Sequence, residues 1–254
     1  MTANSVKASK ALGVGDGRTH RLVAAVLVAA AGLCLVLTGC SVSTPGRPAA
    51  APNLGHWQAP PILNARLGKL LLSSGDVNAV GQTTTMALRR PISEMSHSED
   101  VVSDPNCLDA YSPMEAAVYR DSGWVALEGQ FLDNAHSRTD QQKHALLQGV
   151  VRFRDAELAQ RFFGQAEPRW SACANRPLTI TQPGDEPVNW TLGKLVVTDT
   201  QLSIVQTLDG GKGFACQRAL GVRNNIIIDA LWCGFDTANQ AVDVVTKIAA
   251  AVQE

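Results

Sequence analysis

From about residue 62 onward, some segments of the chain repeat their hydrophobic residues every three to four positions, and others are short apolar runs between turn-forming residues. Where apolar side chains recur at intervals of three and four residues, an amphipathic helix is expected. Pro168 lies inside the longest such pattern and predicts a kink or a restart, because proline has no amide hydrogen to continue a helix. Helices are predicted over Ile62–Ser73, from a Ser74 cap to Val80, over Asn106–Tyr119 with a break near Ser112, from an Asp155 cap to Cys173, and from an Asp236 cap to Val252.

Other segments are rich in β-branched and aromatic residues and are bounded by turn-forming residues, which indicates strands. Several of them follow one another directly, joined by polar stretches such as Asp133–Gln142. Consecutive strands flanked by helices predict an α+β domain, with an antiparallel twisted β-sheet and helices packed on it. The predicted strands are Thr84–Leu88, Trp124–Leu132, Lys143–Phe153, Trp190–Thr198, Leu202–Leu208 and a hairpin over Phe214–Gly234.

The amino-terminal segment has a different pattern, in which basic residues precede a charge-free apolar run. The run covers 16 residues from Leu22 to Leu37. That is shorter than the roughly 20 residues that a permanent membrane-spanning helix needs. The sequence Leu37-Thr38-Gly39-Cys40 ends it and resembles the bacterial lipobox, in which a cysteine is diacylated before cleavage on its amino side. The alternatives are an ordinary signal peptide that ends by chance in these residues and a short transmembrane helix.

We therefore predict three parts: a lipoprotein signal peptide over residues 1–39, a lipid-anchored tether rich in proline and alanine over 40–61, and a folded domain over 62–254. Cys40 would carry the diacylglycerol and palmitate chains, which together give stable attachment to a membrane. The predicted location is the extracytoplasmic face of the cell membrane, with the bilayer contacted through the lipid on Cys40.

Charge and composition exclude several classes of protein. The chain has 254 residues, 22 Lys+Arg against 23 Asp+Glu, and 45% hydrophobic residues. This near-neutral balance argues against a nucleic-acid-binding protein, and the hydrophobic content argues against disorder. Removal of residues 1–39 would leave 18 Lys+Arg against 22 Asp+Glu. The body of the mature protein is therefore expected to have no electrostatic reason to lie on an anionic membrane.

Four cysteines follow Cys40, and an even number outside the cytoplasm favours disulfides over metal or thiol chemistry. None of them has C-x-x-C spacing, so neither a metal site nor a redox site is expected. A two-residue turn at Asn224-Asn225 would place Cys216 opposite Cys233 on a non-hydrogen-bonded rung of the hairpin. This register predicts a Cys216–Cys233 disulfide and leaves Cys107 to pair with Cys173.

The motifs of the common enzyme classes are missing from the sequence. It contains neither G-x-S-x-G nor H-E-x-x-H, and Gly210–Gly213 lacks the spacing of a phosphate-binding loop. His97-Ser98-Glu99 is not followed by the P-C-x-x-C of zinc deaminases. His136 and His144 are expected to be surface or strand-face histidines. We expect no enzyme activity, no cofactor and no metal site.

Arg218 and Asp229 are placed by the predicted register on one face of the hairpin, as a diagonal pair. A salt bridge across the sheet is the expected role of such a pair. Contact with a ligand is the alternative.

A series of short motifs along the chain resembles a known family. From about Leu70 to Val252 the chain resembles the PknH-like extracellular (sensor) domain of actinobacterial receptor kinases and related lipoproteins. The resemblance implies an extracytoplasmic α+β domain with two disulfides and a cleft for an unidentified ligand. The motifs are Leu70-Leu71-Leu72-Ser73 with Val77-Asn78, Pro105-Asn106-Cys107, Trp170-Ser171-Ala172-Cys173-Ala174-Asn175, and Cys216-Gln217-Arg218-Ala219-Leu220 with Asn224-Asn225-Ile226-Ile227-Ile228-Asp229.

The chain differs from the receptor kinases of that family by its lipobox, and neither a kinase domain nor a transmembrane helix is expected. We therefore expect a cell-surface binding module for a small envelope ligand, whose ligand-binding residues the sequence does not identify. The alternative is a module that docks onto another envelope protein and has no small-molecule site. A deep pocket lined by Trp124 or Trp190 would favour the first, and a flat apolar patch the second. A hydrolase would require a serine or aspartate within hydrogen-bond reach of His136 or His144 in a pocket.

Overall fold

A computed structural model describes residues 59–252, apart from residue 138 and residues 140–142. Cys40, the predicted signal peptide and all but the last three residues of the predicted tether lie outside the described residues. The division of the chain at Cys40 therefore stays a prediction. In the part of the chain that the structure describes, no helix combines the length and the hydropathy needed to cross a membrane.

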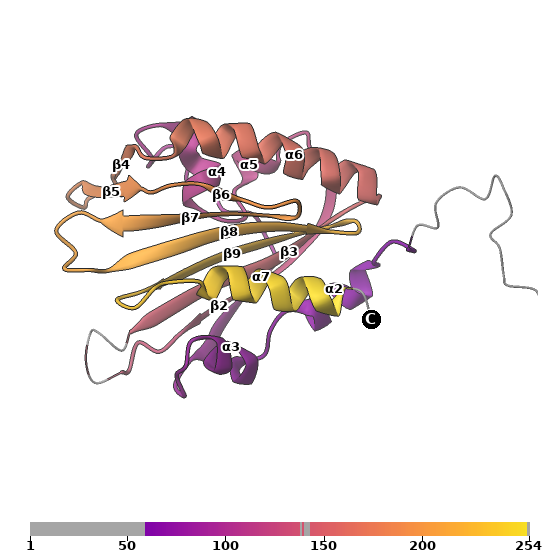
Figure 1. The fold of residues 1–254 in the computed structure, drawn as a ribbon, viewed down its shortest axis with the longest axis horizontal. Helices are drawn as coiled ribbons and strands as arrows, with labels where there is room; N and C mark the ends of the chain where they lie inside the picture. The colour runs from indigo at the N-terminus through magenta and orange to yellow at the C-terminus, as the bar shows by residue number, and fades with distance from the viewer. Residues whose placement is uncertain (1–58, 138, 140–142, 253–254) are drawn as a thin grey trace, which may run out of the picture. The chain divides into compact units, whose positions relative to one another are not determined.

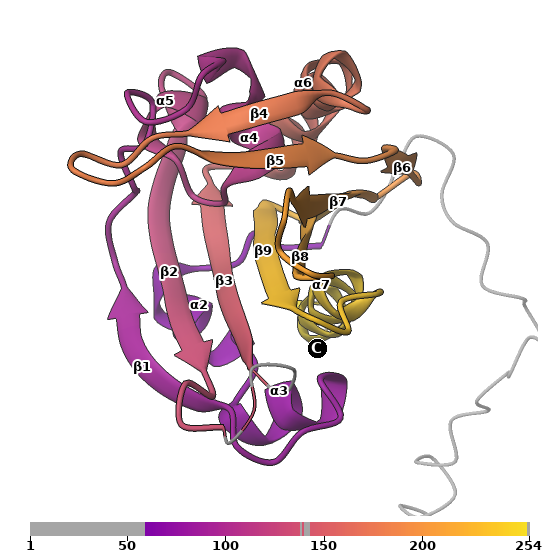
Figure 2. The same cartoon turned by 90° about the vertical axis from the view of Figure 1, so that its left-hand side faces the viewer.

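Nine strands form one antiparallel sheet in the order β1-β2-β3-β9-β8-β7-β5-β4, and β6 pairs with β7 beside this path (Figure 1). The sheet is strongly twisted, so that β4 and β5 run across the direction of β1, β2 and β3 (Figure 2). The strands are β1 Ala87–Ile92, β2 Trp124–Asp133, β3 His144–Phe153, β4 Pro177–Ile180, β5 Val188–Leu192, β6 Val196–Val197, β7 Gln201–Leu208, β8 Ala215–Arg223 and β9 Ile226–Gly234.

Helices cover both faces of this sheet (Figure 1). One core cluster lies under α4, α5 and α6, and a second lies under α2, α3 and α7. The structure thus confirms the predicted α+β class, with an antiparallel twisted sheet, packed helices and two disulfides. The helices are α2 Asn64–Leu70, α3 Ser74–Val80, the 3-10 turn η1 Pro105–Cys107, α4 Leu108–Tyr111, α5 Ala116–Tyr119, α6 Ala156–Cys173 and α7 Gln240–Ala251.

Strand β9 shows why both faces need a helical layer. Ile227 packs into the core cluster under α6, whereas Ile226 and Ile228 pack into the cluster under α7. Successive side chains of a strand point to opposite faces, so a continuous apolar run is stable only where both faces are buried. The three consecutive isoleucines therefore place β9 in the middle layer of the domain.

The β8–β9 hairpin has the register predicted from the sequence. Cys216 pairs with Cys233 and Arg223 with Ile226, around a turn at Asn224-Asn225. The Cα atoms of the two cysteines are 4.0 Å apart, which fits the close approach of a non-hydrogen-bonded pair. Asn224 has a φ of 51°, but Asn225 does not share the positive φ that a type I′ turn needs at both positions. The hairpin carries the Cys216–Cys233 disulfide, and Cys107 is bonded to Cys173.

Two predicted strands differ from those observed. The predicted strand Trp190–Thr198 is divided into β5 and β6. Between them, the Gly193 carbonyl accepts a hydrogen bond from the Asn175 amide, which lies outside the sheet. Strand β4 was not predicted at all, since four residues that begin with proline are too short to show an alternating pattern. Strand β1 begins at Ala87, three residues after the predicted start, and continues through Pro91. Proline is tolerated there because β1 is an edge strand.

The break predicted at Pro168 does not occur. Helix α6 is one helix of 18 residues that includes this proline. Pro168 and Gly164 are exposed, so water can satisfy the Gly164 carbonyl that lacks an amide partner. Of the two predicted outcomes the restart is therefore wrong, and the kink stays a prediction.

Two predicted helix caps were also wrong. Helix α7 begins at Gln240, and Asp236 does not cap it because its carboxylate binds the His144 imidazole instead. Helix α3 is capped by Ser73 rather than Ser74. Asp76 then accepts from the Ser73 backbone and completes a capping box.

Asn225 ties the beginning of the folded domain to the hairpin. Its Oδ1 accepts a hydrogen bond of 2.7 Å from the Ile62 backbone amide. Its Nδ2 donates to the carbonyl oxygens of Ile62 at 3.1 Å and Phe153 at 2.9 Å. Because Asn225 is fully buried, no water can replace these three bonds.

We expect Asn225→Ala to lower the free energy of unfolding by roughly 3 kcal/mol, because it leaves buried backbone groups without partners. The matched control is Asn224→Gly, which keeps the positive φ of the turn and should cost less than about 1 kcal/mol. Urea denaturation of both variants would measure the difference. Equal losses would show that the Asn225 side chain does not hold the two segments together.

Candidate functional site

A cleft of about 380 Å³ lies where the η1 turn, α4, α5 and the second half of α6 meet. Its apolar lining comes from small side chains, which leave the space open. Its polar lining contains one carboxylate and one guanidinium. The apolar residues are Pro105, Ala117, Val118 and Ala172, and the polar ones are Asn106, Asp109 and Arg169.

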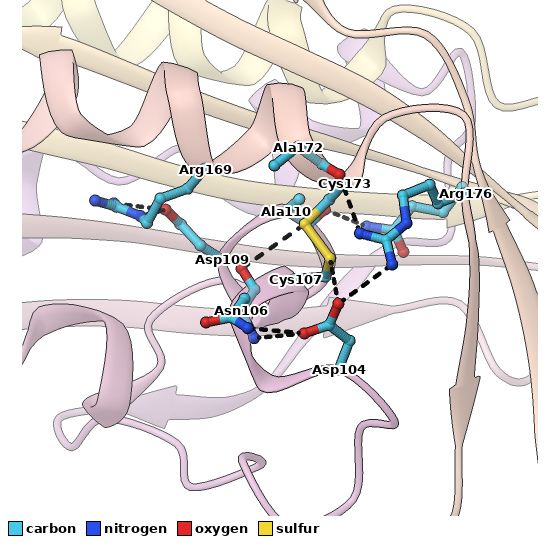
Figure 3. Close-up of a disulfide and its surroundings, with 10 residues drawn as sticks. Asp104, Asn106, Cys107, Asp109, Ala110, Arg169, Ala172, Cys173 and Arg176 are labelled. Atoms are coloured by element: carbon cyan, nitrogen blue, oxygen red, sulfur yellow. Dashed lines mark hydrogen bonds and ion pairs between the residues drawn. A yellow bond between two sulfur atoms is a disulfide. The ribbon is translucent and has the colours of Figure 1, made fainter.

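The Cys107–Cys173 disulfide joins two of these walls, because it links the end of η1 to the last residue of α6 (Figure 3). Asp104 caps η1 by accepting from the Asn106 amide at 3.1 Å. It also lies 3.6 Å from the Arg176 guanidinium, which follows α6. The two sulfurs each lie 3.7 Å from an oxygen, and these are plain contacts because a disulfide sulfur has no hydrogen to donate. The η1 turn is thus fastened to the end of α6 by a covalent bond and an ion pair.

Asp109 and Arg169 form the charged part of the cleft. Arg169 donates from Nε at 3.0 Å and from Nη2 at 2.7 Å to Oδ2 of Asp109. The Asp109 side chain is buried at 4% exposure, whereas that of Arg169 is 35% exposed. The Arg169 guanidinium also lies 5.6 Å from the ring centre of Phe162, which restricts its movement further. Its third nitrogen, Nη1, has no hydrogen bond or ion pair within the described residues.

Behind the cleft, Asp229 holds the α4–α5 segment on the sheet. Its Oδ2 accepts from the Met114 backbone amide at 2.8 Å and from the Tyr119 hydroxyl at 2.9 Å. Its Oδ1 forms an ion pair with Nη2 of Arg218, so this oxygen is not without a partner. Asp229 and Arg218 are both almost completely buried. Residues 114–119 include Ala117 and Val118 of the cleft wall, so one carboxylate positions that wall.

Arg218 completes this buried network. Its Nη1 donates to the carbonyl oxygens of Ala219 at 2.6 Å and Ala230 at 3.1 Å. Its guanidinium carbon lies 5.1 Å from the ring centre of Trp170, in a cation–π arrangement. The structure therefore confirms the salt bridge expected between Arg218 and Asp229, and the pair does not reach the cleft surface.

Burial raises the pKa of Asp229 above that of an ordinary carboxyl, and Arg218 opposes this rise. The negative charge of Asp109 adds to the rise. Burial also raises the pKa of Tyr119 well above its usual range, so the hydroxyl keeps the proton that it donates to Asp229. The cleft and the buried pair are therefore coupled electrostatically through Asp109.

Met114 places its side chain against the sheet in a backbone conformation that is uncommon for methionine, with a φ of 56°. Its sulfur occupies the space above Gly149, where a Cβ atom would come within 2.2 Å of it. A Cβ on Gly129 would lie 3.0 Å from the same sulfur. These two glycines face each other in neighbouring strands and form the seat for the loop that carries Met114.

The histidines singled out in the sequence do not form a catalytic group. His97 is exposed and lies 3.8 Å from Glu99, and His136 is exposed. His144 is buried, with Nε2 at 2.7 Å from Oδ1 of Asp236 and Nδ1 at 3.3 Å from the Asn134 side chain. Both ring nitrogens thus have partners, and neither is free to activate a nucleophile. The pair joins β3 to the segment after β9 and lines none of the three cavities described in this section.

Trp124 and Trp190 line none of the three cavities described in this section, although such a lining would have favoured a small-molecule site. Trp190 is buried in the core cluster under α6, and Trp124 packs against the same cluster. A groove of about 230 Å³ beside β6, β7 and α7 is lined by Val196, Val205 and other residues instead. One further groove, lined by Gly221, Val245 and other residues, has about 250 Å³.

The sequence did not indicate the Asp109–Arg169 pair. The two residues are 60 positions apart, and no local spacing connects them. The available signal was weak: Asp109 is a charge between the apolar residues Leu108 and Ala110 of a predicted helix. Among the described residues, no group of three His, Cys, Asp or Glu side chains could hold a metal ion.

Comparison with known proteins gives one consistent result. Residues 63–251 match the family described as the PknH-like extracellular domain. Over 188 residues the chain is 32% identical to the serine/threonine-protein kinase PknH of Mycobacterium bovis, a match that covers 74% of this chain and 31% of the kinase. The match to PknH of Mycobacterium tuberculosis is also 32% identical and covers 29% of that protein. The chain thus spans about a third or less of the length of these relatives.

The crystal structure of the extracellular domain of PknH from Mycobacterium tuberculosis has the same fold, with a TM-score of 0.72 at 31% identity. The superposition covers 76% of this chain and 98% of that domain. The matched region is the extracellular domain of these relatives and not their kinase domain.

Asp229→Ala should lower the free energy of unfolding by about 3–5 kcal/mol, because it leaves the Arg218 charge buried without its partner. Tyr119→Phe is the matched control, since it removes one hydrogen bond to the same carboxylate and should cost about 1–2 kcal/mol. Thermal or urea unfolding measures both. A loss for Asp229→Ala no larger than that of the control would contradict the assignment of Asp229 as the group that holds the α4–α5 segment.

Proposed function

Because the chain belongs to the family of PknH-like extracellular domains, we propose that it is a cell-surface lipoprotein whose extracytoplasmic domain binds a small ligand in the cleft between α4, α5 and α6. Membership of the family makes the domain extracytoplasmic and of sensor type. The kinase activity named for the relatives belongs to those proteins, and the role proposed for this chain is binding rather than catalysis.

The Arg169 guanidinium is the observation that carries this proposal. Two of its nitrogens are fixed on the buried Asp109 carboxylate, while Nη1 is left without a partner among the described residues. A planar guanidinium held in this way suits a carboxylate, a phosphate or another strong hydrogen-bond acceptor. The small apolar residues opposite it supply contact area for the rest of such a ligand.

Attachment to the membrane is the second part of the proposal. The lipobox at residues 37–40 supports lipidation of Cys40, and the proline- and alanine-rich stretch up to residue 61 supports a tether between the lipid and the domain. Two or more acyl chains hold a protein stably on a bilayer, whereas one chain is marginal.

An envelope-protein docking module is the second candidate function. It is favoured by the exposed valines of the β5–β7 region, where Val196 is 55% and Val197 is 45% exposed and Val205 lies beside them. Val196 and Val205 line the groove that runs along α7. Exposed apolar residues that gather in one place are typical of surfaces that contact other proteins.

We expect native mass spectrometry of the oxidised chain over residues 41–254, after incubation with an envelope extract, to give a small-molecule adduct that is lost on unfolding. Arg169→Gln should reduce the adduct by about tenfold or more, since it removes a charge-assisted hydrogen bond. The matched control is Arg176→Gln, an arginine beside the same disulfide that does not line the cleft.

An adduct that both variants retain would place the ligand outside the cleft. A bare protein peak in the unmodified chain would reject the small-molecule function. Cross-linking from Val196→Cys would then test the docking module.

Replacing Cys40 with Ala should move the protein from the membrane fraction to the soluble fraction, because the acyl chains would have no attachment point. Cell fractionation with immunoblotting measures this distribution. A second variant, Cys34→Ala, is the control and should leave the protein in the membrane. Retention of the Cys40 variant in the membrane would show that another segment anchors the chain.

A further inference from the structure

The position at which the chain enters its folded domain is fixed by the hairpin turn. The Asn224 side chain donates to the Pro60 carbonyl at 2.8 Å. The Asn225 side chain forms hydrogen bonds with both the amide and the carbonyl of Ile62. The tip of the β8–β9 hairpin therefore marks the end of the domain at which the described chain begins. Helix α2 begins at the same end (Figure 1).

Arginines gather at this end. Ile226 pairs with Arg152 of β3 on one side and with Arg223 of β8 on the other, so the two arginines flank it on one face of the sheet. Neighbouring strands are about 4.8 Å apart, which places the two arginine Cα atoms roughly 10 Å from each other. Arg152 donates to the Asn64 side chain of α2, which brings Arg66 of that helix to the same end.

Leu63 adds an apolar group to this region. It directly precedes α2 and is 64% exposed, the largest exposure among the large hydrophobic residues of the described chain. Arg154, two residues after Arg152, is also exposed. We call the group Leu63, Arg66, Arg152, Arg154 and Arg223 the tether-end patch.

Two acidic side chains at this end already have partners within the domain. The Asp155 carboxylate caps α6 by accepting from the Leu158 amide, and Glu157 forms an ion pair with Arg161. Asp121 and Asp199 are exposed near the strand ends, as is Arg120. Among the described residues of this end, the arginines at positions 66, 120, 152, 154 and 223 outnumber the aspartates at 121, 155 and 199, although the mature chain as a whole carries an excess of acids.

The chain outside the described residues indicates what this patch meets. Nineteen residues separate Cys40 from Pro60, and even when fully extended they span at most about 70 Å. A lipid on Cys40 would therefore keep the point where the chain enters the domain within about 70 Å of a bilayer, which gives the tether-end patch a high effective concentration at its surface. Under these conditions weak electrostatic contacts suffice to orient a domain.

We infer that the tether-end patch is a second, weak membrane contact, in which the arginines bind anionic phospholipid headgroups and Leu63 inserts at the interface. The inference rests on the proposed attachment through Cys40. Each arginine near an anionic surface strengthens binding by about fivefold, and the effect decays within a Debye length of about 10 Å. The contact would thus hold the hairpin tip against the bilayer and would weaken as salt increases.

Vesicle co-sedimentation of the mature chain carrying Cys40→Ser tests this contact without the lipid. Binding is expected to vesicles of phosphatidylcholine with phosphatidylglycerol at low salt, and not to phosphatidylcholine alone. Arg154→Glu with Arg223→Glu should weaken binding by about tenfold or more. These two exposed side chains have no hydrogen bond or ion pair within the described residues, so the fold should be retained.

The matched control is Arg90→Glu with Lys212→Glu, which changes the net charge equally but at exposed positions toward the other end of the sheet. Leu63→Ser should weaken binding without any change in charge. Equal effects of the two double variants, or equal binding to neutral vesicles, would overturn the inference. Because this chain carries no lipid, its result is separate from the Cys40→Ala fractionation and from ligand binding in the cleft.

Discussion

The Arg218–Asp229 ion pair, buried on the central hairpin, determines how the elements on one face of the sheet are arranged. Removing a charge from water without a partner costs several kcal/mol, so the pair needs polar and aromatic neighbours. Among the polar atoms of the pair, only Arg218 Nε has no hydrogen-bond or ion-pair partner within the described residues. Asp229 obtains the Met114 amide and the Tyr119 hydroxyl, and Arg218 lies over the ring of Trp170. These neighbours come from α5, from the loop before it and from α6. Compensating one buried charge pair therefore fixes residues 114–119 and α6 on the central hairpin, and these three parts are distant in sequence.

The walls of the cleft are held in part by the same contacts. Its α5 wall is held through Tyr119, its η1 wall is held by the Cys107–Cys173 disulfide, and its charged wall is held by Asp109. A site whose walls are fixed before a ligand arrives loses little conformational freedom on binding. In the proposed site, Nη1 of Arg169 would offer its two N–H groups in directions set by the contacts of the other two nitrogens.

Local patterns predicted those parts of the fold in which sequence neighbours are also spatial neighbours. The β8–β9 register followed from a turn of two asparagines between two apolar runs, and the same register brought Arg218 beside Asp229. The α6 helix followed from its apolar stripe, with only the effect of Pro168 misjudged. In each of these cases the deciding contacts lie within a single element or hairpin.

The parts that could not be predicted depend on contacts between distant segments. Asp236 was expected to cap a helix because aspartate commonly does so, but its partner His144 is 92 positions away. The Asp109–Arg169 pair likewise exists only because α4 packs against α6. Whether Trp190 lines a pocket was likewise not decided by any local pattern, and in the structure it is buried in the core cluster under α6.

The two proposed contacts of the domain lie at different ends of α6. This helix begins next to the tether-end patch, at Asp155, and ends at Cys173 beside the cleft. Arg169 lies thirteen residues after the first residue of the helix, Ala156, a distance of about 20 Å along its axis. With the patch on the bilayer and the axis of α6 perpendicular to it, Arg169 would lie about 20 Å from the lipid headgroups. A headgroup within the bilayer plane would then be out of reach of Arg169, so the ligand chemistry that fits both contacts is a soluble or projecting envelope component with an anionic group.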